Sequence, residues 1–458
     1  MTRIIAVTGQ AGTGKTTWLI QKAAEVAPNL LKDEHNSILA ITRMHGSRRR
    51  LLAKMDEACP CLPCTVTTID GFALTITNRW RTSLGYNRPI QPVNSETDFT
   101  DTILGTEAGF MQIVQAATRL LASTTVKAII HRSFPLVLID EFQDCHGPLL
   151  DFIKALAKCS NLLLAADDFQ FLESNVTGCP AIEWVRQAEK EGAASCTSLV
   201  TCHRTSNQSI LEAAKCLRDG TPTSAATVPV ICCPNKGPAA YKIMEALIFK
   251  HKTWSGSTAL ICPSHDRFLD EVLSSLDTQL AKKNNHPLSW FHEGSSGDAH
   301  KNLCDCLGVS DANLTNTWCA PSTPLDSASC QVINRISRFS KLKGLPSITQ
   351  TVVARYIDKV IQERRAYSPH SPKRIITTVH GAKNREFDNV IVLWPYSVRD
   401  DPQQKRRLLY NAITRARKNC MVLIRGNKQR VAQDAALSLL GPAQDAFPST
   451  TVKKGTAK

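Results

Sequence analysis

Short apolar runs alternate with longer amphipathic stretches along most of the chain. Eight runs rich in Ile, Val, Leu, Ala and Thr have the length and composition of buried strands: 4–8, 37–42, 65–69, 136–139, 162–166, 258–262, 374–378 and 390–393. An amphipathic segment at 17–26 follows the first run. Short apolar strands that alternate with helical stretches are typical of βαβ units and parallel sheets. The pattern therefore predicts an α/β protein with two such blocks, 1–197 and 198–446.

Each block is interrupted by a segment with a different pattern. The first, 73–133, has apolar residues at helical spacing: Met111, Val114, Ala117 and Leu121. The second, 281–373, opens with a loop-like stretch rich in Ser, Asn, Gly and Pro and then carries a helical stripe: Val352, Val353, Tyr356, Ile357, Val360 and Ile361. We expect two cores, each with a mostly helical insertion. The first core is expected at 1–72 and 134–197, with its insertion at 73–133. The second core is expected at 198–280 and 374–446, with its insertion at 281–373. A disordered basic tail is expected at 447–458.

Composition narrows the class of protein. A hydrophobic share of 43% and a charged share of 21% exclude a wholly disordered chain. The formal net charge is +15, and the segments 331–374 and 399–430 are strongly basic, which favours a polyanionic partner such as nucleic acid. No apolar window is long enough to span a membrane, and the first residues lack a signal-peptide pattern. We expect a cytoplasmic or nucleic-acid-associated intracellular protein with no membrane partner.

The seventeen cysteines are best interpreted as reduced thiols that are mostly buried. Two clusters raise the alternative of zinc: Cys59, Cys61 and Cys64, and Cys304, Cys306, Cys319 and Cys330. A structural zinc site usually has four ligands in well-spaced pairs. The first cluster has only three cysteines, and the second begins with a cramped C-x-C. Buried thiols are favoured, and zinc at the first cluster stays an open alternative.

A phosphate-binding loop follows the first predicted strand. The stretch 9–16 matches G-x-x-x-x-G-K-[ST] in full: Gly9, Gln10, Ala11, Gly12, Thr13, Gly14, Lys15 and Thr16, with Thr17 opening the next segment. The glycines let backbone N–H groups curl around phosphate, and Lys15 reaches the terminal phosphates. The Thr16 hydroxyl is a ligand for Mg²⁺. The loop predicts nucleotide binding and, by itself, nothing more.

A pair of acids ends the strand predicted at 136–139. Asp140, at the end of a buried strand, can hold Mg²⁺ together with Thr16, and Glu141 can polarise the attacking water. Combined with the upstream phosphate loop, these acids predict a nucleoside triphosphatase with ATP and Mg²⁺ as its cofactors.

The stretch D-E-F-Q-D at 140–144 resembles the D-E-x-Q-D box of superfamily 1 helicases of the UvrD, Rep and PcrA type. The other family boxes have counterparts in the same order: I-T-R at 41–43, T-T-I-D-G-F at 67–72, A-D-D-F-Q at 166–170, C-H-R-T-S at 202–206, T-T-V-H-G-A-K-N-R-E-F at 377–387 and R-L-L-Y-N-A-I-T-R-A at 407–416. The resemblance runs from residue 4 to about residue 425, and its ordered boxes are far more specific than a lone phosphate loop.

The resemblance implies two RecA-like cores with ATP bound between them. It implies catalytic roles for Lys15, Asp140, Glu141 and Gln170 of the first core and for Arg204 and Arg415 of the second. Gln170 would contact the γ-phosphate, and the two arginines would place charge on the leaving phosphoryl group. Glu386 would contact the ribose, while single-stranded DNA would be contacted by Thr42, Thr68 and His380. The implied activity is ATP-dependent translocation on DNA or unwinding of DNA, in the 3′ to 5′ direction.

Several positions depart from the family pattern. The chain begins too close to its first strand to carry the adenine-reading segment, and His203 stands where the family has an adenine-stacking tyrosine, so we expect relaxed nucleotide selectivity. Arg43 and the stretch 171–174 replace DNA-stacking aromatics, with Trp184 and Phe171 as candidate substitutes. We therefore expect DNA to be held mainly through its phosphates. Asn384 replaces a glycine of the family pattern, and both insertions are shorter than those of the full-size helicases.

Three functions remain open from the sequence. The leading one is a helicase or translocase that acts alone. The second is a DNA-dependent ATPase subunit that senses DNA for a partner protein such as a nuclease, and the short insertions lean slightly toward it. The third, a nucleoside triphosphatase that acts on RNA or on no nucleic acid, conflicts with the ordered boxes and the net charge.

Overall fold

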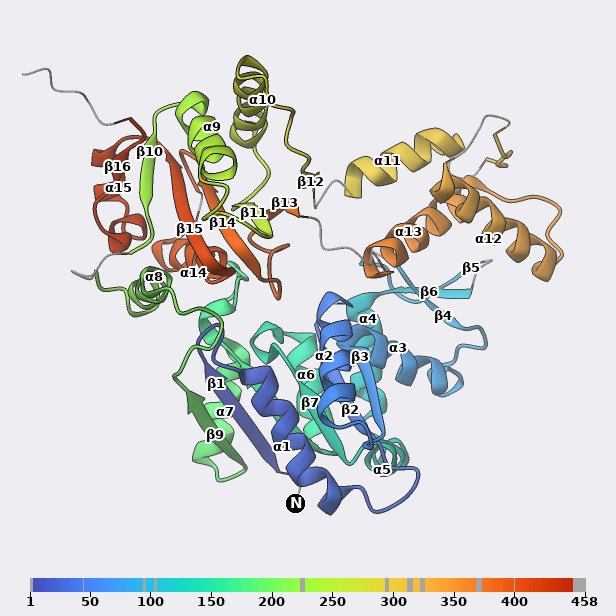
Figure 1. The fold of residues 1–458 in the computed structure, drawn as a ribbon. Helices are drawn as coiled ribbons and strands as arrows, with labels where there is room; N and C mark the ends of the chain where they lie inside the picture. Colours follow the sequence, from blue (N-terminus) through green and yellow to red (C-terminus); the bar gives the residue numbers. More distant parts are fainter. Residues whose placement is uncertain are drawn as a thin grey trace, which may run out of the picture.

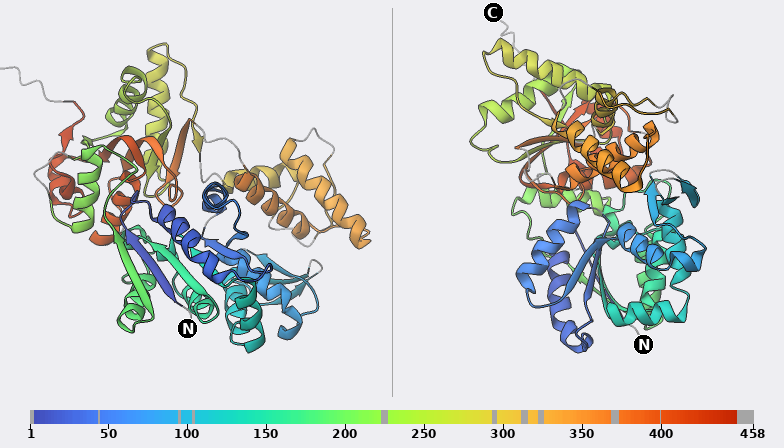
Figure 2. Two further views of the ribbon diagram at one scale, coloured as in Figure 1. Left: turned by 60° about the horizontal axis from the view of Figure 1, so that its bottom comes forward. Right: turned by 90° about the vertical axis from the view of Figure 1, so that its right-hand side faces the viewer.

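The computed structural model describes residues 3–43, 45–93, 96–102, 105–222, 227–292, 296–310, 316–321, 326–367, 373–398 and 400–447. Two α/β cores lie one above the other, the first at the bottom of Figure 1 and the second at the top. The side view in Figure 2 shows the same stacking. Of the tail expected at 447–458, only Phe447 belongs to the described residues.

The first core is built on a six-stranded sheet with the order β3-β2-β7-β8-β1-β9, in which every neighbouring pair is parallel. Its strands are β1 (Ile4–Gly9), β2 (Ile38–Thr42), β3 (Cys64–Thr68), β7 (Leu136–Ile139), β8 (Asn161–Ala166) and β9 (Ala194–Leu199). Five of them were predicted. β9 was not, because this edge strand is partly exposed and its sequence, A-S-C-T-S-L, is too polar to stand out. It also crosses the expected boundary at 197.

Helices cover both faces of this sheet. One face packs against α1 (Lys15–Leu30) and α2 (His45–Ala58). The other face packs against α3 (Ile69–Arg79), α4 (Phe110–Leu120), α5 (Thr124–Ser133), α6 (Pro148–Ala157) and α7 (Pro180–Lys190). Both faces of β7 are buried, with Leu136 and Leu138 on one side and Val137 and Ile139 on the other. Strands buried on both faces produce the continuous apolar runs of the sequence.

The first insertion is mostly helical, as predicted, but it also contains a small sheet. Beyond the 3₁₀ turn at Arg81–Leu84, strands β4 (Ile90–Val93), β5 (Thr100–Thr102) and β6 (Gly105–Gly109) pair in the order β4-β6-β5. These strands are short and carry glycine and charged residues, so no apolar run marked them. α3 and α4 pack into the core of the first sheet, and the small sheet projects from it.

The second core is a seven-stranded sheet with the order β12-β13-β11-β14-β15-β10-β16. Its strands are β10 (Val230–Cys233), β11 (Thr258–Cys262), β12 (Phe291–His292), β13 (Arg374–Thr378), β14 (Phe387–Trp394), β15 (Ala416–Arg425) and β16 (Gln444–Asp445). Its helices are α8 (Gln208–Asp219), α9 (Lys236–Met244), α10 (Arg267–Lys282), α14 (Pro402–Ile413) and α15 (Lys428–Gln433). β11, β13 and β14 were predicted. β12 lies within 281–373, so this part of the expected insertion belongs to the sheet.

The second insertion forms a separate lobe of three helices, α11 (Ser296–Leu307), α12 (Ser327–Lys343) and α13 (Gln350–Tyr367), with an apolar core of its own. The predicted stripe at 352–361 lies in α13, whereas α11 occupies the opening that was expected to be loop-like. The lobe reaches over the small sheet of the first insertion, where Arg355 pairs with Glu107 of β6.

No single helix in the described ranges is long and apolar enough to cross a bilayer. Only α4 and α5 taken together pass that test, and they are bent by 99° at the break between them.

Candidate nucleotide site between the two cores

The phosphate-binding loop joins β1 to α1, and two of its glycines are required by geometry. Gly12 and Gly14 have φ values of 81° and 82°, in the left-handed region that favours glycine. A Cβ added to Gly12 would lie 2.6 Å from the Cβ of Arg204, so the linker between the cores closes against the loop. Lys15 Nζ donates to the carbonyls of Gly9 and Gln10 at 2.9 and 2.8 Å. The loop thus has the curled form that binds phosphate.

The two predicted metal ligands lie together. Asp140 follows β7, and the Thr16 hydroxyl donates to its Oδ2 at 3.0 Å. Burial, together with the adjacent Glu141, raises the pKa of Asp140 to about 6. A hydroxyl and a carboxylate are the oxygen ligands that Mg²⁺ prefers, so this pair fits the expected ion.

Glu141 is held in an unusual backbone conformation. Its φ of 58° is uncommon for a residue other than glycine, and such outliers cluster at functional sites. Its Oε2 accepts a hydrogen bond from Gln143 Nε2 at 2.5 Å, and Gln143 Oε1 accepts from the N–H of Asp167 at 3.0 Å. The D-E-F-Q-D box is thereby tied to the end of β8.

Gln170 does not face open space. It lies in the 3₁₀ turn Asp168–Gln170, is buried, and donates through Nε2 to Asp167 Oδ2 at 3.0 Å. Asp167 is fully buried and also lies 3.9 Å from Lys15 Nζ. Burial alone would raise the pKa of Asp167, but Lys15 and Arg218 hold this pKa below its usual value. Gln170 therefore reaches the phosphate-binding loop through Asp167.

The second core contributes a cluster of arginines around Glu386. Arg204 Nε donates to Glu386 Oε1 at 2.8 Å, and Arg417 donates to Oε2 from Nε and from its terminal nitrogen at 3.0 and 2.8 Å. Burial alone would raise the pKa of Glu386, but these two arginines lower it to about 2. The expected ribose-contacting carboxylate is therefore a fixed anion.

Arg415 is almost completely buried and forms no ion pair with a carboxylate in the described part of the chain. Its Nε donates to the carbonyl of Asn411 at 3.1 Å, and a terminal nitrogen donates to Thr414 Oγ1 at 3.4 Å. Burial and the nearby Arg204 lower its pKa to about 10, so it stays charged at neutral pH. A buried unpaired cation is costly, and it fits a site that receives an anionic group.

Three contacts between the cores involve residues to which the sequence assigned no role. The Tyr410 hydroxyl, buried in α14, accepts from the N–H of Ala11 at 2.8 Å and donates to Asp167 Oδ2 at 3.0 Å. Arg218 of α8 donates to Asp167 at 2.6 Å and also pairs with Asp168. Lys383 donates to Asp144 at 2.6 Å.

The sequence held a signal for some of these residues and none for others. Tyr410, Lys383 and Asp144 stand inside recognisable boxes, so their position could have suggested a role. Arg218 lies outside every box. So does Arg50 of α2, which lies close enough to interact electrostatically with Glu386, Glu141 and Asp140.

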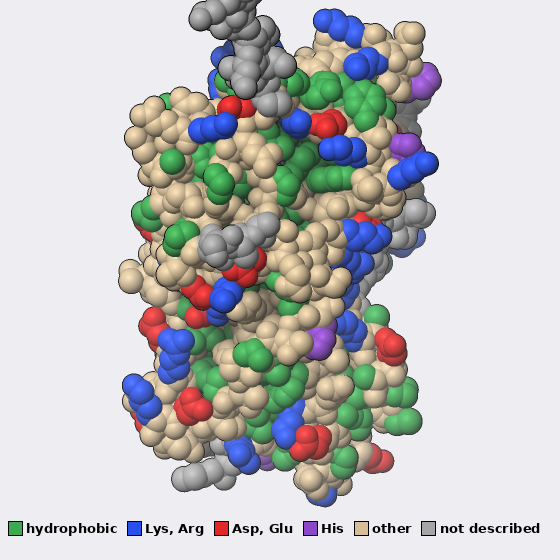
Figure 3. Space-filling model, turned by 60° about the vertical axis from the view of Figure 1, so that its left-hand side comes forward, with side chains coloured by type: hydrophobic (Ala, Val, Ile, Leu, Met, Phe, Trp, Pro, Cys, Tyr) green, Lys and Arg blue, Asp and Glu red, His purple; other side chains and the backbone are tan. Residues whose placement is uncertain are grey.

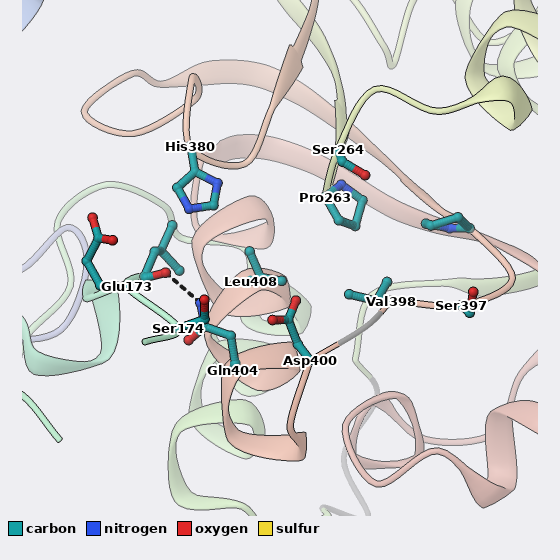
Figure 4. A pocket seen from close by; sticks show the side chains of 12 residues that line it. Glu173, Ser174, Pro263, Ser264, His380, Ser397, Val398, Asp400, Gln404 and Leu408 are labelled. Atoms are coloured by element: carbon teal, nitrogen blue, oxygen red, sulfur yellow. Dashed lines mark hydrogen bonds between the residues drawn. The ribbon is translucent and has the colours of Figure 1, made fainter. Parts of the chain in front are cut away.

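The three expected DNA contacts are placed differently from one another. Thr42 and Thr68 are paired in register at the carboxyl ends of β2 and β3, but both are buried. The Thr68 hydroxyl accepts from the N–H of Gly71 at 3.1 Å and so caps α3. His380 is exposed on the loop after β13, where it borders a cavity between the cores (Figure 4). Only His380 presents its side chain to the surface.

Two family domains match this chain. A model of the UvrD/REP helicase N-terminal domain matches residues 97–172, and a model of the UvrD-like helicase C-terminal domain matches residues 375–423. Together the two matches support a UvrD-like superfamily 1 helicase. The search of curated proteins found no match.

Two solved structures resemble this chain at low identity. The Arterivirus nonstructural protein 10 helicase is 13% identical, with a TM-score of 0.31; the alignment covers 92% of this chain and 59% of the viral one. A Pif1 helicase from Bacteroides, in complex with ADP-AlF3 and single-stranded DNA, is 14% identical, with a TM-score of 0.37; the alignment covers 92% of this chain and 88% of that one. The chain thus spans less than two thirds of the viral protein.

Departures of this chain from the family pattern have structural explanations at two places. Asn384, where the family has glycine, has a φ of 61°, and asparagine tolerates this conformation better than most residues. Phe171 is fully buried, and the half-buried Trp184 packs edge-on against Phe142 with ring centroids 5.8 Å apart. Phe171 is therefore not exposed for stacking on DNA, and Trp184 is in part packed against the first core.

Basic side chains lie on both cores, and the cysteines of the first cluster differ in exposure. On the face shown in Figure 3, Lys and Arg side chains are spread over both cores and several follow the right-hand edge. Within the described ranges, no three His, Cys, Asp or Glu side chains gather as a metal-binding group. In the first cysteine cluster, Cys59 is buried, Cys64 is partly buried and Cys61 is exposed.

Proposed function

We propose that this chain is an ATP-dependent translocase on single-stranded DNA, and that it separates DNA strands as it moves in the 3′ to 5′ direction. The observation that carries the proposal is Arg415, a buried and unpaired guanidinium of the second core that is electrostatically coupled to Glu141 of the first. A cation in this position matches the charge that develops on a transferred phosphoryl group.

The first core supplies the groups that hold and attack the nucleotide. The loop N–H groups and Lys15 would bind the phosphates of ATP, and Thr16 and Asp140 would hold Mg²⁺, which neutralises phosphate charge when bound. Glu141, which accepts a hydrogen bond from Gln143, would orient and deprotonate the attacking water. On the second core, Arg204 would assist Arg415, and Glu386 would contact the ribose.

Contacts between the cores give a route from hydrolysis to movement. Tyr410 touches both the phosphate-binding loop and Asp167, and Lys383 pairs with Asp144. A change at the nucleotide would alter these contacts and so shift one core against the other. Because the loop of His380 lies on one core and the carboxyl ends of β2 and β3 lie on the other, such a shift would change the spacing between two regions that would contact DNA.

Strand displacement by the purified chain tests the proposal. We expect ATP hydrolysis stimulated by single-stranded DNA, together with unwinding of a duplex that has a 3′ overhang and none of a duplex with a 5′ overhang. Glu141→Gln should bind both ligands without turnover. Absence of both DNA binding and DNA stimulation would contradict the proposal.

The second candidate is a DNA-dependent ATPase subunit that serves a partner protein such as a nuclease. It is favoured by the short insertions, since the second one is a lobe of only three helices in the described ranges. DNA-stimulated hydrolysis without strand displacement would select this candidate over the first.

Nucleotide selectivity is a separate part of the proposal. His203, which replaces the family's tyrosine, lies beside the phosphate-binding loop, where its ring is 3.7 Å from the position that a Cβ on Gly14 would take. We expect GTP and CTP to be hydrolysed at rates comparable to that of ATP. Steady-state turnover of the three nucleotides measures this, and a strong preference for ATP would contradict it.

A further inference from the structure

A cavity of about 460 Å³ lies where the two cores meet, on the side of His380 (Figure 4). The first core contributes the segment 172–174, directly after Gln170. The second core contributes the residues that follow β11 and β14, the loop that carries His380, and part of α14. Ligands of parallel α/β sheets bind at the carboxyl ends of strands, and the volume is within the range of small-molecule sites.

The shape of the cavity is fixed by a hydrogen bond between the cores. Gln404 of α14 is almost fully buried, and its Nε2 donates to the carbonyl of Leu172 at 2.7 Å. This bond is the dashed line in Figure 4. The cavity is therefore shared by both cores and depends on their relative position.

The lining of the cavity does not suit a phosphate. None of the described residues that line it is Lys or Arg, whereas Glu173 and Asp400 both line it. Two carboxylates repel a phosphate. The site instead suits a group that carries no negative charge and that offers hydrogen-bond donors.

The remaining walls suit a flat ring. Pro263, Val398 and Leu408 present apolar surface, and Asp400 directs its carboxylate into the space between Leu408 and Val398 (Figure 4). An unstacked nucleobase has apolar faces and a polar edge, and proteins that read single strands hold such bases against apolar or aromatic side chains while hydrogen-bonding the edge.

We propose that this cavity receives one base of the single strand and that Asp400 selects a base with an exocyclic amino group, cytosine over thymine. An ionised carboxylate only accepts hydrogen bonds. Cytosine presents its N4 amino group where thymine presents the O4 acceptor, so thymine would set two acceptors against each other. The inference rests on the proposed function, because it assumes that single-stranded DNA passes His380.

Equilibrium binding of oligo-dC and oligo-dT of equal length to the full chain tests this selectivity. We expect oligo-dC to bind about fivefold more tightly or better, which is the lower end of the discrimination that base contacts give. The two oligonucleotides carry the same number of phosphates. Their affinity ratio should therefore stay constant as salt is added, although both affinities fall.

Substitutions of the carboxylates that line the cavity test whether the selectivity arises there. In Asp400→Asn the amide can donate as well as accept, so the ratio of the two affinities should fall toward one. Adding Glu173→Gln tests the rim carboxylate. Asp151→Asn is the matched control, because it removes one carboxylate charge from an exposed position on α6. Unchanged thermal unfolding would show that each variant is folded.

The binding results distinguish failure of the proposed base pocket from failure of the proposed function. Equal binding of the two oligonucleotides, tighter binding of oligo-dT, or a ratio that survives in the Asp400→Asn variant with Glu173→Gln would each overturn the base pocket and leave the DNA-binding proposal intact. Failure of the unaltered chain to bind either oligonucleotide would overturn both.

Discussion

At the scale of single residues, two charged groups of the nucleotide site differ in whether they have a partner of opposite charge. Glu386 is a partly buried anion held by two arginines, whereas Arg415 is a buried cation whose partners among the described residues are carbonyl and hydroxyl oxygens. The first arrangement is satisfied as it stands. The second gains a charged partner only when an anion enters the cleft, which is the property expected of a group that stabilises a transition state.

For Arg415→Ala we expect ATP to bind while DNA-stimulated turnover falls by about 10³-fold or more. Arg415→Lys probes the charge itself. Burial lowers the pKa of Arg415 and should likewise lower the pKa of a lysine at this position below its ordinary value. The residual turnover of Arg415→Lys should therefore fall as pH rises, because the lysine loses its charge. Near-normal turnover by Arg415→Ala in a pH-rate series would show that Arg415 plays no catalytic part.

Glu386→Gln should lower the free energy of unfolding by about 1–3 kcal/mol at neutral pH. The folded pKa of about 2 lies below the ordinary value of 4.5, so the ionised carboxylate stabilises the fold above about pH 4.5. That contribution is lost as pH falls toward 2. Urea unfolding of both proteins at several pH values measures the difference, with Glu25→Gln, in an exposed pair with Lys22, as the control. A difference that grows on acidification would contradict the assignment.

At the scale of elements, the candidate functional residues lie where parallel strands end. Asp140 follows β7, Asp167 follows β8, and His380 follows β13. The carboxyl ends of parallel strands share one edge of a sheet, so a residue placed after each strand reaches the same region. Such junctions also require unusual backbone conformations, as Glu141 and Asn384 show.

Asn384 tests this backbone requirement in the loop between β13 and β14. We expect Asn384→Gly to fold normally, because glycine adopts its φ of 61° without cost. Asn384→Val should lower the free energy of unfolding by about 1–3 kcal/mol, since a β-branched residue is strained there. Chemical denaturation of the three proteins measures the effect, and equal stability of the valine and glycine variants would contradict it.

At the scale of the whole molecule, the two cores are joined through the nucleotide site itself. Tyr410, Arg218 and Lys383 of the second core contact Ala11, Asp167, Asp168 and Asp144 of the first. These contacts surround the phosphate-binding loop, so the relative position of the cores and the state of the loop are coupled. The lobe of α11–α13 adds a distant contact through Arg355 and Glu107.

Tyr410→Phe keeps the ring, which packs against Phe169 at 5.1 Å, and removes only the hydroxyl. Because Ala11 and Asp167 each lose a buried partner, we expect the free energy of unfolding to fall by about 1–3 kcal/mol. Turnover should fall on the order of 10-fold to 100-fold through misplacement of the loop. Steady-state kinetics measure this, with Tyr86→Phe in the first insertion as the control. Unaltered turnover would show that the hydroxyl does not couple the cores.

DNA affinity should depend strongly on salt, because the candidate stacking rings Phe171 and Trp184 are packed into the first core. On a single strand we expect a log–log slope near −0.7 for each phosphate contact. Trp184→Ala should leave DNA affinity almost unchanged. Titration of a fluorescent oligonucleotide at several salt concentrations measures both, and a shallow slope with a large loss in Trp184→Ala would favour stacking instead.

Local sequence determined the class of fold and the chemistry of the site. Strands buried on both faces appear as apolar runs, and the residues after each run are the ones that reach the shared edge of the sheet. The phosphate-binding loop, Asp140 beside Thr16, and the two-core division could therefore be predicted. Short polar strands such as β5 and β9 could not, because their pairing depends on neighbours rather than on their own composition.

Only the tertiary structure decided which side chains meet across the cores. Tyr410 and Ala11 are 399 residues apart in the chain, and their contact depends on how two separately folded sheets pack together. Packing also buried Thr42 and Thr68, turned Gln170 toward Asp167, and left Arg415 without a carboxylate in the described part of the chain. A pattern of residue types specifies which strand end a side chain follows, but burial and partners are properties of the assembled surfaces.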